Sequence, residues 1–450
     1  MKKWMTLLLA AAMLLGLAAC GAGAPEADAP SESGLHFAAA TSVYENEYKA
    51  DDGTLLLSEH YELPRLELRT ADGALYTAAE NLTANTASSG AAAAQVMAQS
   101  VFNNEMDSVL AGLKAEAGQM AAEAKKLYAS DGGDSLFALG GHWASELAVG
   151  SVYQTGGGLV SVRAEGYTYY GGSHPNGSTR AWNFDLTTGG FLTADDLAEQ
   201  NGAYSDYPFR RAIYWGMLDE IEAKGLAEGY FDDYDSYLWD FSSFAAINFT
   251  ADGLTVTFDP YIIAPYAAGA QIFEIPYEKF FYTLDRHTQA LFDMPQEKIV
   301  EADYHVTQSM WTWFHMTTPP IDESMPSIED ENGYTYYHFG IKGVDTMEQL
   351  RALLEEHVTG EVVDEWLAYS PDRFKEVDGR LYVLSADRGG DDSYGSQSLS
   401  VDLEKGVLTQ TVERLDYTDD GYVPNGEEVF EYPFTLVGGH AVFSAFPCPY

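Results

Sequence analysis

The sequence has little basic charge and almost no cysteine. Of its 450 residues, 69 are acidic and only 24 are Lys or Arg, so the formal net charge is -45 at pH 7. Such a surface repels nucleic acid and anionic membranes; it either attracts a basic partner or simply faces solvent. Cys20 and Cys448 are the only cysteines. The folded regions between them therefore hold together without an internal disulfide.

No complete catalytic motif or zinc motif is present. The chain has no H-E-x-x-H, no C-x-x-C and no G-x-S-x-G pattern, and isolated histidines on strands or loops are usually structural. Carboxylate pairs for glycoside cleavage can be drawn anywhere among 69 acids, so no single pair is informative. We predict a protein that is not an enzyme and that has no cofactor, with Ca²⁺ as the one candidate ion.

The Ca²⁺ candidate is a partial EF-hand loop. Asp416, Thr418, Asp420 and Glu427 occupy four ligand positions of that pattern, although Thr replaces the usual Asp or Asn at one of them. The flanking segments 408–415 and 429–437 have strand patterns instead of helical ones. An acidic hairpin loop is therefore the competing interpretation.

The N-terminus predicts export. Lys2 and Lys3 precede an apolar segment at 4–19, as in a secretory signal. Leu17-Ala18-Ala19-Cys20 matches the bacterial lipobox, in which Cys20 is acylated; an ordinary signal peptide with a chance cysteine is the alternative. We predict a lipoprotein signal peptide at 1–20, a disordered acidic tether at 21–34, and an anchor on the extracytoplasmic face of a Gram-positive cell membrane. Cys448 would then be a free thiol or form an intermolecular bridge.

Hydrophobic periodicity predicts an α+β fold in which antiparallel sheets pack with helices in two folded regions. Expected strands are 42–48, 54–68, 143–154, 159–170, 246–249, 254–258, 272–275, 334–341, 380–386, 396–402, 408–415, 429–437 and 440–446. Expected helices are 91–129 (beginning near Gln95), 208–224, 277–281, 346–357 and 361–369, with a further helix start at 193–197. The predicted parts are 35–165, 166–293, an irregular Pro-punctuated connector at 294–326, and a C-terminal domain at 327–450 whose meander wraps its helices.

The long helix has an identifiable apolar face. Val101, Met106, Val109, Leu110, Leu113, Met120 and Leu127 recur at helical spacing in an Ala-rich background. This pattern is typical of an amphipathic helix that packs on a sheet.

The most distinctive segment is 167–192, YTYYGGSHPNGSTRAWNFDLTTGGFL. Gly171-Gly172 and Asn176-Gly177 suit turn positions with positive φ, and Pro175 stiffens the bend. One interpretation is the tip of a long hairpin and nothing more. The other is an exposed polar tip, with Ser173, His174 and Asn176 available to a partner, because binding residues concentrate on loops held by rigid strands.

Several ordered motifs carry a family resemblance. They are G-G-S-H-P-N-G at 171–177, N-F-D-L-T-T-G at 183–189, D-D-L at 195–197, F-D-P-Y at 258–261, I-A-P-Y-A-A-G at 263–269 and I-P-Y at 275–277. With them, residues 35–293 resemble the extracellular domain of RsiV-type anti-sigma factors, which bind lysozyme, and an accessory module of PdaC-type peptidoglycan deacetylases. The chain lacks the anti-sigma factor's spanning helix and sigma-binding segment, and the deacetylase's His-rich metal domain.

What the resemblance implies is binding. It places two loops on the side that faces lysozyme, with Gly172, Ser173, His174, Asn176, Pro260, Tyr261, Pro265 and Tyr266 as partner-binding residues. Lysozymes are commonly basic, so the net charge of -45 would steer one toward the chain. The expected function is a lipoprotein that sequesters or senses a cell-wall hydrolase. Two alternatives stay open: a peptidoglycan- or glycan-binding envelope protein, and an envelope hydrolase.

The last region, 327–446, is similar to IseA-type inhibitors of cell-wall DL-endopeptidases. The resemblance is carried by V-D-G-R-L-Y at 377–382 and S-A-D-R-G-G at 385–390, after two helices and before the meander. It implies a second surface that binds a hydrolase.

Overall fold

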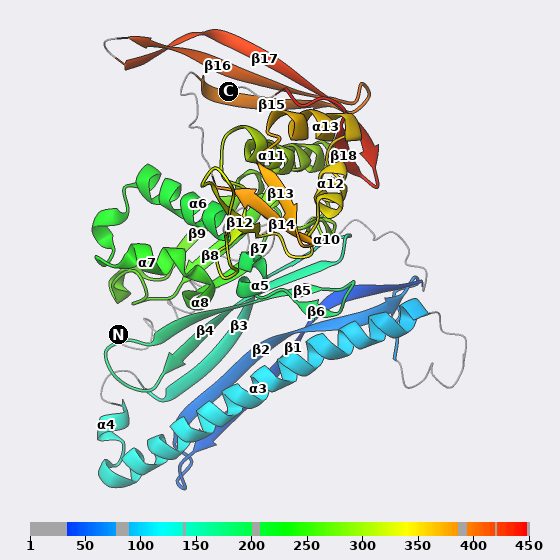
Figure 1. Cartoon of the computed structure of the whole chain (residues 1–450). Coiled ribbons are helices and arrows are strands. Elements are labelled where there is room, and N and C mark those ends of the chain that lie inside the picture. Colours follow the sequence, from blue (N-terminus) through cyan, green and yellow to red (C-terminus); the bar gives the residue numbers. More distant parts are fainter. Residues whose placement is uncertain are drawn as a thin grey trace.

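The computed structural model describes residues 34–77, 90–137, 141–199, 208–385, 394–418 and 421–447 (Figure 1). The predicted signal peptide with Cys20, nearly all of the tether, Asp420 and Cys448 lie outside these residues. The α+β prediction is confirmed, since four separate sheets pack with helices.

The first sheet has six strands in sequence order: β1 (Leu35–Lys49), β2 (Leu55–Thr70), β3 (Trp143–Gln154), β4 (Leu159–Tyr169), β5 (Asn176–Asp185) and β6 (Gly190–Phe191). All neighbours are antiparallel except β2 and β3, which run parallel from Leu57 opposite Trp143. A parallel pair needs a long crossover, because the chain must return to the end at which the first strand began.

Helix α3 (Gly90–Asp131) supplies this crossover and lies along one face of the sheet (Figure 1). Its 42 residues span about 63 Å, enough to carry the chain back along the 16 residues of β2, which span about 54 Å. Met106 and Leu113 are buried, as the apolar pattern predicted. The closest packing, however, comes from Phe102 and from small residues, of which Ala98, Ala117, Ala121 and Ala124 are buried.

The opposite face of this sheet is covered by a second unit. It contains α5 (Ala194–Glu199), α6 (Pro208–Lys224), α7 (Tyr234–Trp239), α8 (Phe241–Phe244), the sheet β7 (Ala245–Phe249), β8 (Gly253–Phe258) and β9 (Gln271–Pro276), then α9 (Tyr277–Phe280), the 3-10 turn η4 (Phe281–Thr283) and α10 (Arg286–Gln289). Gly216 lets α6 approach β9, because a Cβ there would lie 2.9 Å from the Ile275 side chain.

A buried polar chain joins the two sheets. The Ser161 hydroxyl donates to Asn183 Oδ1 at 2.7 Å and accepts the Phe249 N–H at 2.8 Å, while Asn183 Nδ2 donates to the Ile247 carbonyl at 3.0 Å. The neighbouring residues Val160 and Val162 point the other way, into the core under α3.

The predicted irregular connector at 294–326 is wrong in its central part, which forms the helix α11 (Gln296–His315). The prolines that suggested irregularity flank the helix: Pro295 is its N-cap, and Pro319 and Pro320 follow its end. Its buried residues include Val300, Asp303, Tyr304, Thr307, Met310, Trp311 and Phe314. This is helical spacing, so the aromatic residues of the segment form the core of the C-terminal region.

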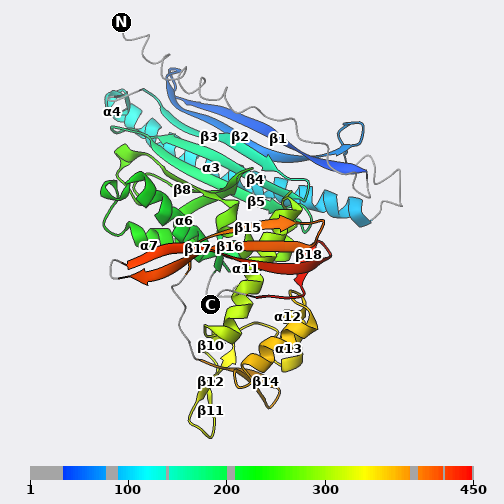
Figure 2. The same ribbon diagram turned by 90° about the horizontal axis from the view of Figure 1, so that it is seen from above.

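The C-terminal region has two sheets around α11. One contains β10 (Ile321–Asp322), β11 (Ile328–Glu329), β12 (Thr335–Phe339), β13 (Phe374–Val377) and β14 (Arg380–Leu384); the other is the meander β15 (Tyr394–Asp402), β16 (Val407–Thr418), β17 (Gly421–Val437) and β18 (His440–Phe443). The helices are α12 (Met347–Glu355) and α13 (Gly360–Tyr369). The single wrapping meander was therefore an incorrect expectation, because β14 pairs with β12 and β13. Figure 2 shows α11 passing beneath the meander toward the other sheet.

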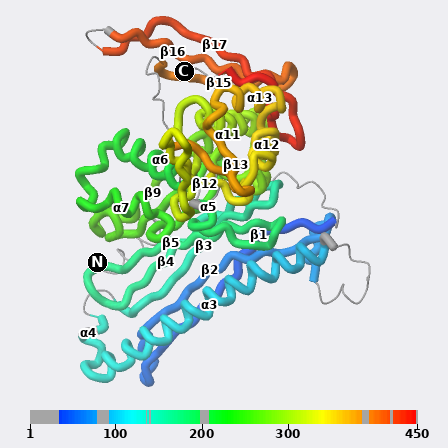
Figure 3. Tube along the Cα trace, viewed as in Figure 1, coloured from blue at the N-terminus to red at the C-terminus, as the bar shows by residue number. Residues whose placement is uncertain are grey.

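The meander lies on the side of the molecule remote from α3 (Figure 3). Contacts between α11 and the meander include Asp303, whose carboxylate accepts from His440 Nδ1 at 3.0 Å and from the Ala441 N–H at 2.7 Å. Within the described residues, no helix is both long enough and apolar enough to span a membrane.

Candidate binding surface

Two loops that are distant in sequence meet at one edge of the molecule. The β4–β5 hairpin tip brings His174 against Tyr266, which follows β8; their ring centroids are 3.8 Å apart and the rings are nearly parallel, at 21°. The Tyr261 hydroxyl lies 3.4 Å from His174 Nε2, and its ring centroid is 5.7 Å from that of Tyr266. We call these three side chains the loop-tip surface.

Seven of the eight predicted partner-binding residues lie on these two loops, and Asn176 is the first residue of β5 next to the first loop. Gly172, Ser173, Asn176, Tyr261 and Pro265 are exposed, whereas His174, Pro260 and Tyr266 are half-buried. Tyr261 leaves 56% of its surface exposed, an unusually large share for an aromatic side chain held in a ring cluster. The structure therefore brings the two predicted loops together and leaves most of their residues accessible.

The hairpin tip has a defined conformation. Gly171 and Gly172 have φ values of 91° and 99°, which confirms the predicted glycine turn. Asn176-Gly177 is not a turn, because Gly177 pairs with Tyr167 in the β4–β5 ladder. The Tyr169 hydroxyl donates to the Gly172 carbonyl at 3.3 Å. These contacts fix the loop from which His174 projects.

The backbone of Tyr261 is strained. Its φ is 74°, in the left-handed region that side chains with a Cβ rarely adopt. A hydrogen bond from the Tyr261 N–H to the Ala264 carbonyl, at 3.0 Å, closes the turn that holds it there. Strained residues concentrate at functional sites, since the surrounding structure must maintain them. No sequence pattern signals this conformation, because glycine would be the expected residue.

A half-buried carboxyl lies at the start of the second loop. Burial raises the pKa of Asp259 above its ordinary value, although hydrogen bonds from Thr179 and the charge of Arg163 act against this. Nearby Tyr167 is 37% exposed, and burial of its hydroxyl, together with the negative charge of Glu146, raises its pKa as well. Sequence analysis did not single out Tyr167 or Asp259.

The 183–189 motif has a structural role instead of a position at the loop tips. The Asp185 carboxylate accepts hydrogen bonds from the Thr187 N–H and hydroxyl at 2.7 and 2.6 Å, from the Thr188 hydroxyl at 2.7 Å and from His287 Nε2 at 2.7 Å. Burial alone would raise the pKa of Asp185, but these hydrogen bonds outweigh it and hold the pKa below its ordinary value. The motif thus folds the β5–β6 turn.

The 195–197 motif caps a helix. The Asp196 N–H donates to the Thr193 hydroxyl at 3.0 Å, and the Thr193 N–H donates to an Asp196 carboxylate oxygen at 3.0 Å. This is a reciprocal cap at the start of α5, as expected for Thr193. Leu197 is fully buried below it.

The Ca²⁺ candidate falls on a hairpin. Asp416 lies on β16 and pairs with Val423. Glu427 lies on β17 and pairs with Glu413 of β16. Asn425 Nδ2 donates to Asp416 Oδ2 at 2.6 Å. The flanking elements are strands and not the helices of an EF-hand. Asp420 and the Thr418 side chain lie outside the described part, within which no cluster of three or more His, Cys, Asp or Glu side chains suits a metal ion.

The 377–382 motif also has a local explanation. Asp378 and Gly379 have φ values of 52° and 72° and connect β13 to β14, with Val377 paired to Arg380. An Asp-Gly pair is a common solution for such a two-residue hairpin. Residues 386–390 of the second motif lie outside the described residues.

Comparison with known proteins gives limited information. No curated protein matches the chain significantly in sequence. A crystal structure of a DUF3298 family member from Bacteroides fragilis is 14% identical with a TM-score of 0.36, and the alignment covers 57% of this chain and 96% of that one. A DUF3298 family protein from Pseudomonas aeruginosa is 17% identical with a TM-score of 0.33, covering 58% and 98%. At these values neither likeness carries an argument. A DUF3298 domain, whose family is described as a protein of unknown function, is found at residues 216–278, which include Tyr261 and Tyr266.

Proposed function

We propose that this chain is a non-enzymatic lipoprotein of the outer face of a bacterial cell membrane that binds a basic cell-wall hydrolase. The loop-tip surface would enter the hydrolase's substrate cleft and occlude it, so that the enzyme is sequestered or sensed. The observation that carries the proposal is the ring cluster of His174, Tyr261 and Tyr266, which is assembled from loops about ninety residues apart and leaves Tyr261 exposed and the other two rings half-buried.

The chemistry of this surface suits a protein partner. Tyrosine contributes a large, rigid contact area and a hydroxyl at low entropic cost, and for that reason it is enriched at binding hot spots. Tyr261 is already held in its projecting conformation by the turn to Ala264, so little further ordering is needed on binding. Preorganisation of this kind favours affinity, because the conformational entropy of this loop is lost when the chain folds and not when the partner binds.

Charge supports a basic partner. The net charge of -45 raises the encounter rate with a cationic protein, and it does so less at high salt. Membrane attachment rests on the lipobox at Cys20, which the sequence predicts. The weaker resemblance of 327–446 to endopeptidase inhibitors would give the same chain a second hydrolase-binding region.

Calorimetry with hen-type lysozyme tests the proposal on the soluble chain from Gly21 onward. We expect binding that weakens with salt and is lost in the Ser173→Arg/Tyr266→Ala double variant. Met97→Ala is the control, because Met97 is 69% exposed on α3, outside both loops and outside 327–446. Equal binding by the double variant and the control would refute the loop-tip surface as the binding site. Turnover of muropeptides by the chain alone would refute the non-enzymatic role.

A further inference from the structure

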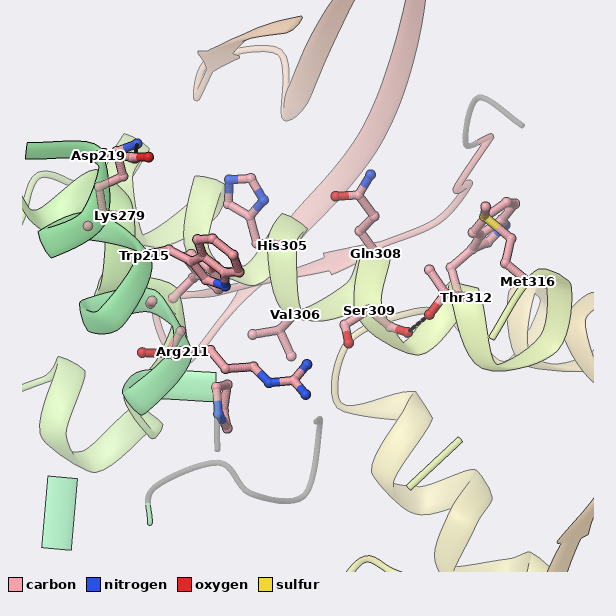
Figure 4. A pocket seen from close by; sticks show the side chains of 16 residues that line it. Arg211, Trp215, Asp219, Lys279, His305, Val306, Gln308, Ser309, Thr312 and Met316 are labelled. Carbon is pink, nitrogen blue, oxygen red and sulfur yellow. Dashed lines mark hydrogen bonds and ion pairs between the residues drawn. The ribbon is translucent and has the colours of Figure 1, made fainter. Parts of the chain in front are cut away.

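A cleft of about 570 Å³ lies between α6 and α11, two helices from different parts of the chain. Figure 4 shows Arg211 and Trp215 reaching from α6 toward α11, with His305 and Gln308 on the α11 side. α11, which the sequence did not predict, forms one side of the cleft, so the sequence did not predict the cleft either. It involves none of the residues of the loop-tip surface.

The cleft carries one cation that no acidic residue of its lining balances. Most Lys and Arg side chains lie within ion-pair distance of a carboxylate, as Lys279 does with Asp219 at 2.9 Å in the cleft itself. Arg211 is exposed and has no ion pair or hydrogen bond among the described residues. Asp219 is the only acidic residue of the lining, so one positive charge remains unbalanced there in a chain of net charge -45.

The lining also offers a flat apolar face beside polar groups. Trp215 leaves 60% of its surface exposed, although indole rings are usually covered in folded proteins. Gln308, Ser309 and Thr312 present hydrogen-bonding groups from α11. An exposed indole next to several amide and hydroxyl groups suits a sugar ring, whose apolar face stacks while its hydroxyls form hydrogen bonds.

His305 adds a neutral hydrogen-bonding group. Burial lowers its pKa to about 4, so the imidazole is uncharged at neutral pH and offers one donor and one acceptor. Its ring packs against Tyr282 at a centroid distance of 5.0 Å, and neither ring nitrogen has a hydrogen-bond partner within the described residues. A ligand hydroxyl would supply that partner.

We propose that the cleft between α6 and α11 binds a saccharide that carries a carboxylate. The sugar ring stacks on Trp215, the carboxylate pairs with the Arg211 guanidinium, and the hydroxyls contact the polar side chains of α11. A single carboxylate matches the single unbalanced cation, whereas a ligand with several phosphates would exceed it. This site is separate from the loop-tip surface and would act whether or not that surface binds a protein.

A pair of sugars that differ in one carboxylate tests the proposal. N-acetylmuramic acid carries a lactyl carboxylate that N-acetylglucosamine lacks. We expect the soluble chain to bind the acidic sugar about threefold more tightly, because the ion pair with Arg211 forms only with it and an ion pair at an exposed residue is weak. Calorimetry measures both affinities, and quenching of tryptophan fluorescence reports contact with Trp215.

Variants separate the contributions. Arg211→Gln should remove the preference for the acidic sugar, whereas Arg380→Gln, the same change at an exposed residue of β14 outside the cleft, should leave it intact. Trp215→Ala should weaken both sugars, and Tyr266→Ala should weaken neither. Failure of both sugars to bind, equal affinity for the two, or an unchanged preference in Arg211→Gln would each overturn the proposal. Absence of lysozyme binding by the unmutated chain, with its sugar binding intact, would count against the loop-tip surface alone.

Discussion

The tip and the base of one hairpin, 171–177 and 183–189, differ in what holds their side chains. At the base, Asn183 and Asp185 are almost completely buried, and each joins separate parts of the fold through several hydrogen bonds. At the tip, Ser173 and Asn176 are exposed. The ring of His174 packs against the rings of Tyr261 and Tyr266 on the facing loop. Residues of one continuous motif thus serve two purposes, and burial distinguishes them.

This difference narrows the candidate binding residues. Both Asp185 and His174 belong to motifs that carry the resemblance, but replacing a buried, hydrogen-bonded carboxylate changes folding before it changes any surface. Binding experiments on the base would report on unfolding. We therefore expect substitutions at the base to lower the free energy of unfolding and substitutions at the tip to leave it nearly unchanged.

Asp185→Ala should have the largest effect on stability. It removes the acceptor for Thr187, Thr188 and His287. These donors belong to exposed or half-exposed residues and can turn to water, so the loss is that of the hydrogen bonds to a charged group, and we expect about 2 kcal/mol in the free energy of unfolding. Urea denaturation measures the loss. The affinity of the remaining folded protein for lysozyme should be that of the wild type. A stable Asp185→Ala protein with lost binding would contradict our assignment of the base.

Thr193→Ala should have a smaller effect of the same kind. It deletes the cap of α5 and leaves the Asp196 N–H without its acceptor, which costs about 1 kcal/mol. Thr193→Ser keeps the hydroxyl and is the matched control, with a loss well below that of the alanine variant. If both variants were equally stable, the cap would contribute nothing measurable.

Much of the fold was predictable because its signals are local. The predicted bounds of β3 and α6 agree with the structure. β3 has the alternating pattern of a strand and α6 has the apolar face of a helix, and glycine or polar residues mark where each pattern ends. α11 was missed because its flanking prolines were taken for interior breaks. The face of α3 was only partly predicted, because Ala117 and Ala121 pack on the sheet without looking apolar in a periodic pattern.

The candidate sites depend on contacts that no local pattern encodes. Both loops of the loop-tip surface were predicted, but through a resemblance; the stacking of His174 on Tyr266 follows from how two sheets pack. The positive φ of Tyr261 could not be predicted from the sequence, because glycine is the residue expected at such a φ value. The cleft at Arg211 requires two helices separated by about seventy residues of chain, one of them missed. Whether either surface binds a ligand stays a prediction.

Two carboxyls should respond to pH in opposite ways. The pKa of Asp185 is lowered, so its stabilisation is complete above about pH 4 and is lost as pH falls through the lower folded-state pKa. The pKa of Asp259, at the start of the second loop, is raised, so the folded state holds its proton more tightly. Its contribution to stability therefore declines as pH rises from about 4 toward the folded-state pKa.

Asp→Asn variants isolate each carboxyl from the many other acids. Urea unfolding should show that the stability of wild type relative to Asp259→Asn falls as pH rises from about 4, whereas that relative to Asp185→Asn stays constant there and shrinks in stronger acid. Parallel slopes for the two variants would show that the pKa of Asp259 is not raised by its half-buried position.

Tyr261→Gly should have the smallest effect on stability, and of the opposite sign. Tyr261 is largely exposed and has a φ of 74°, which costs a residue with a Cβ about 1–2 kcal/mol and costs glycine almost nothing. Relief of this strain offsets the lost ring contacts with His174 and Tyr266 and the greater freedom of glycine in the unfolded chain. We expect the free energy of unfolding to be unchanged or to rise by up to about 1 kcal/mol, while lysozyme binding weakens.

Tyr261→Ala is the control, because alanine keeps the Cβ and therefore the strain while removing the ring. It should be less stable than Tyr261→Gly and should bind lysozyme equally weakly. If the glycine variant were instead clearly less stable than wild type, the ring of Tyr261 would be a structural contact like Asp185. Tyr261, the most exposed ring of the loop-tip surface, would then stabilise the fold as the buried base does. Exposure would no longer distinguish residues available for binding from residues that fold the turn.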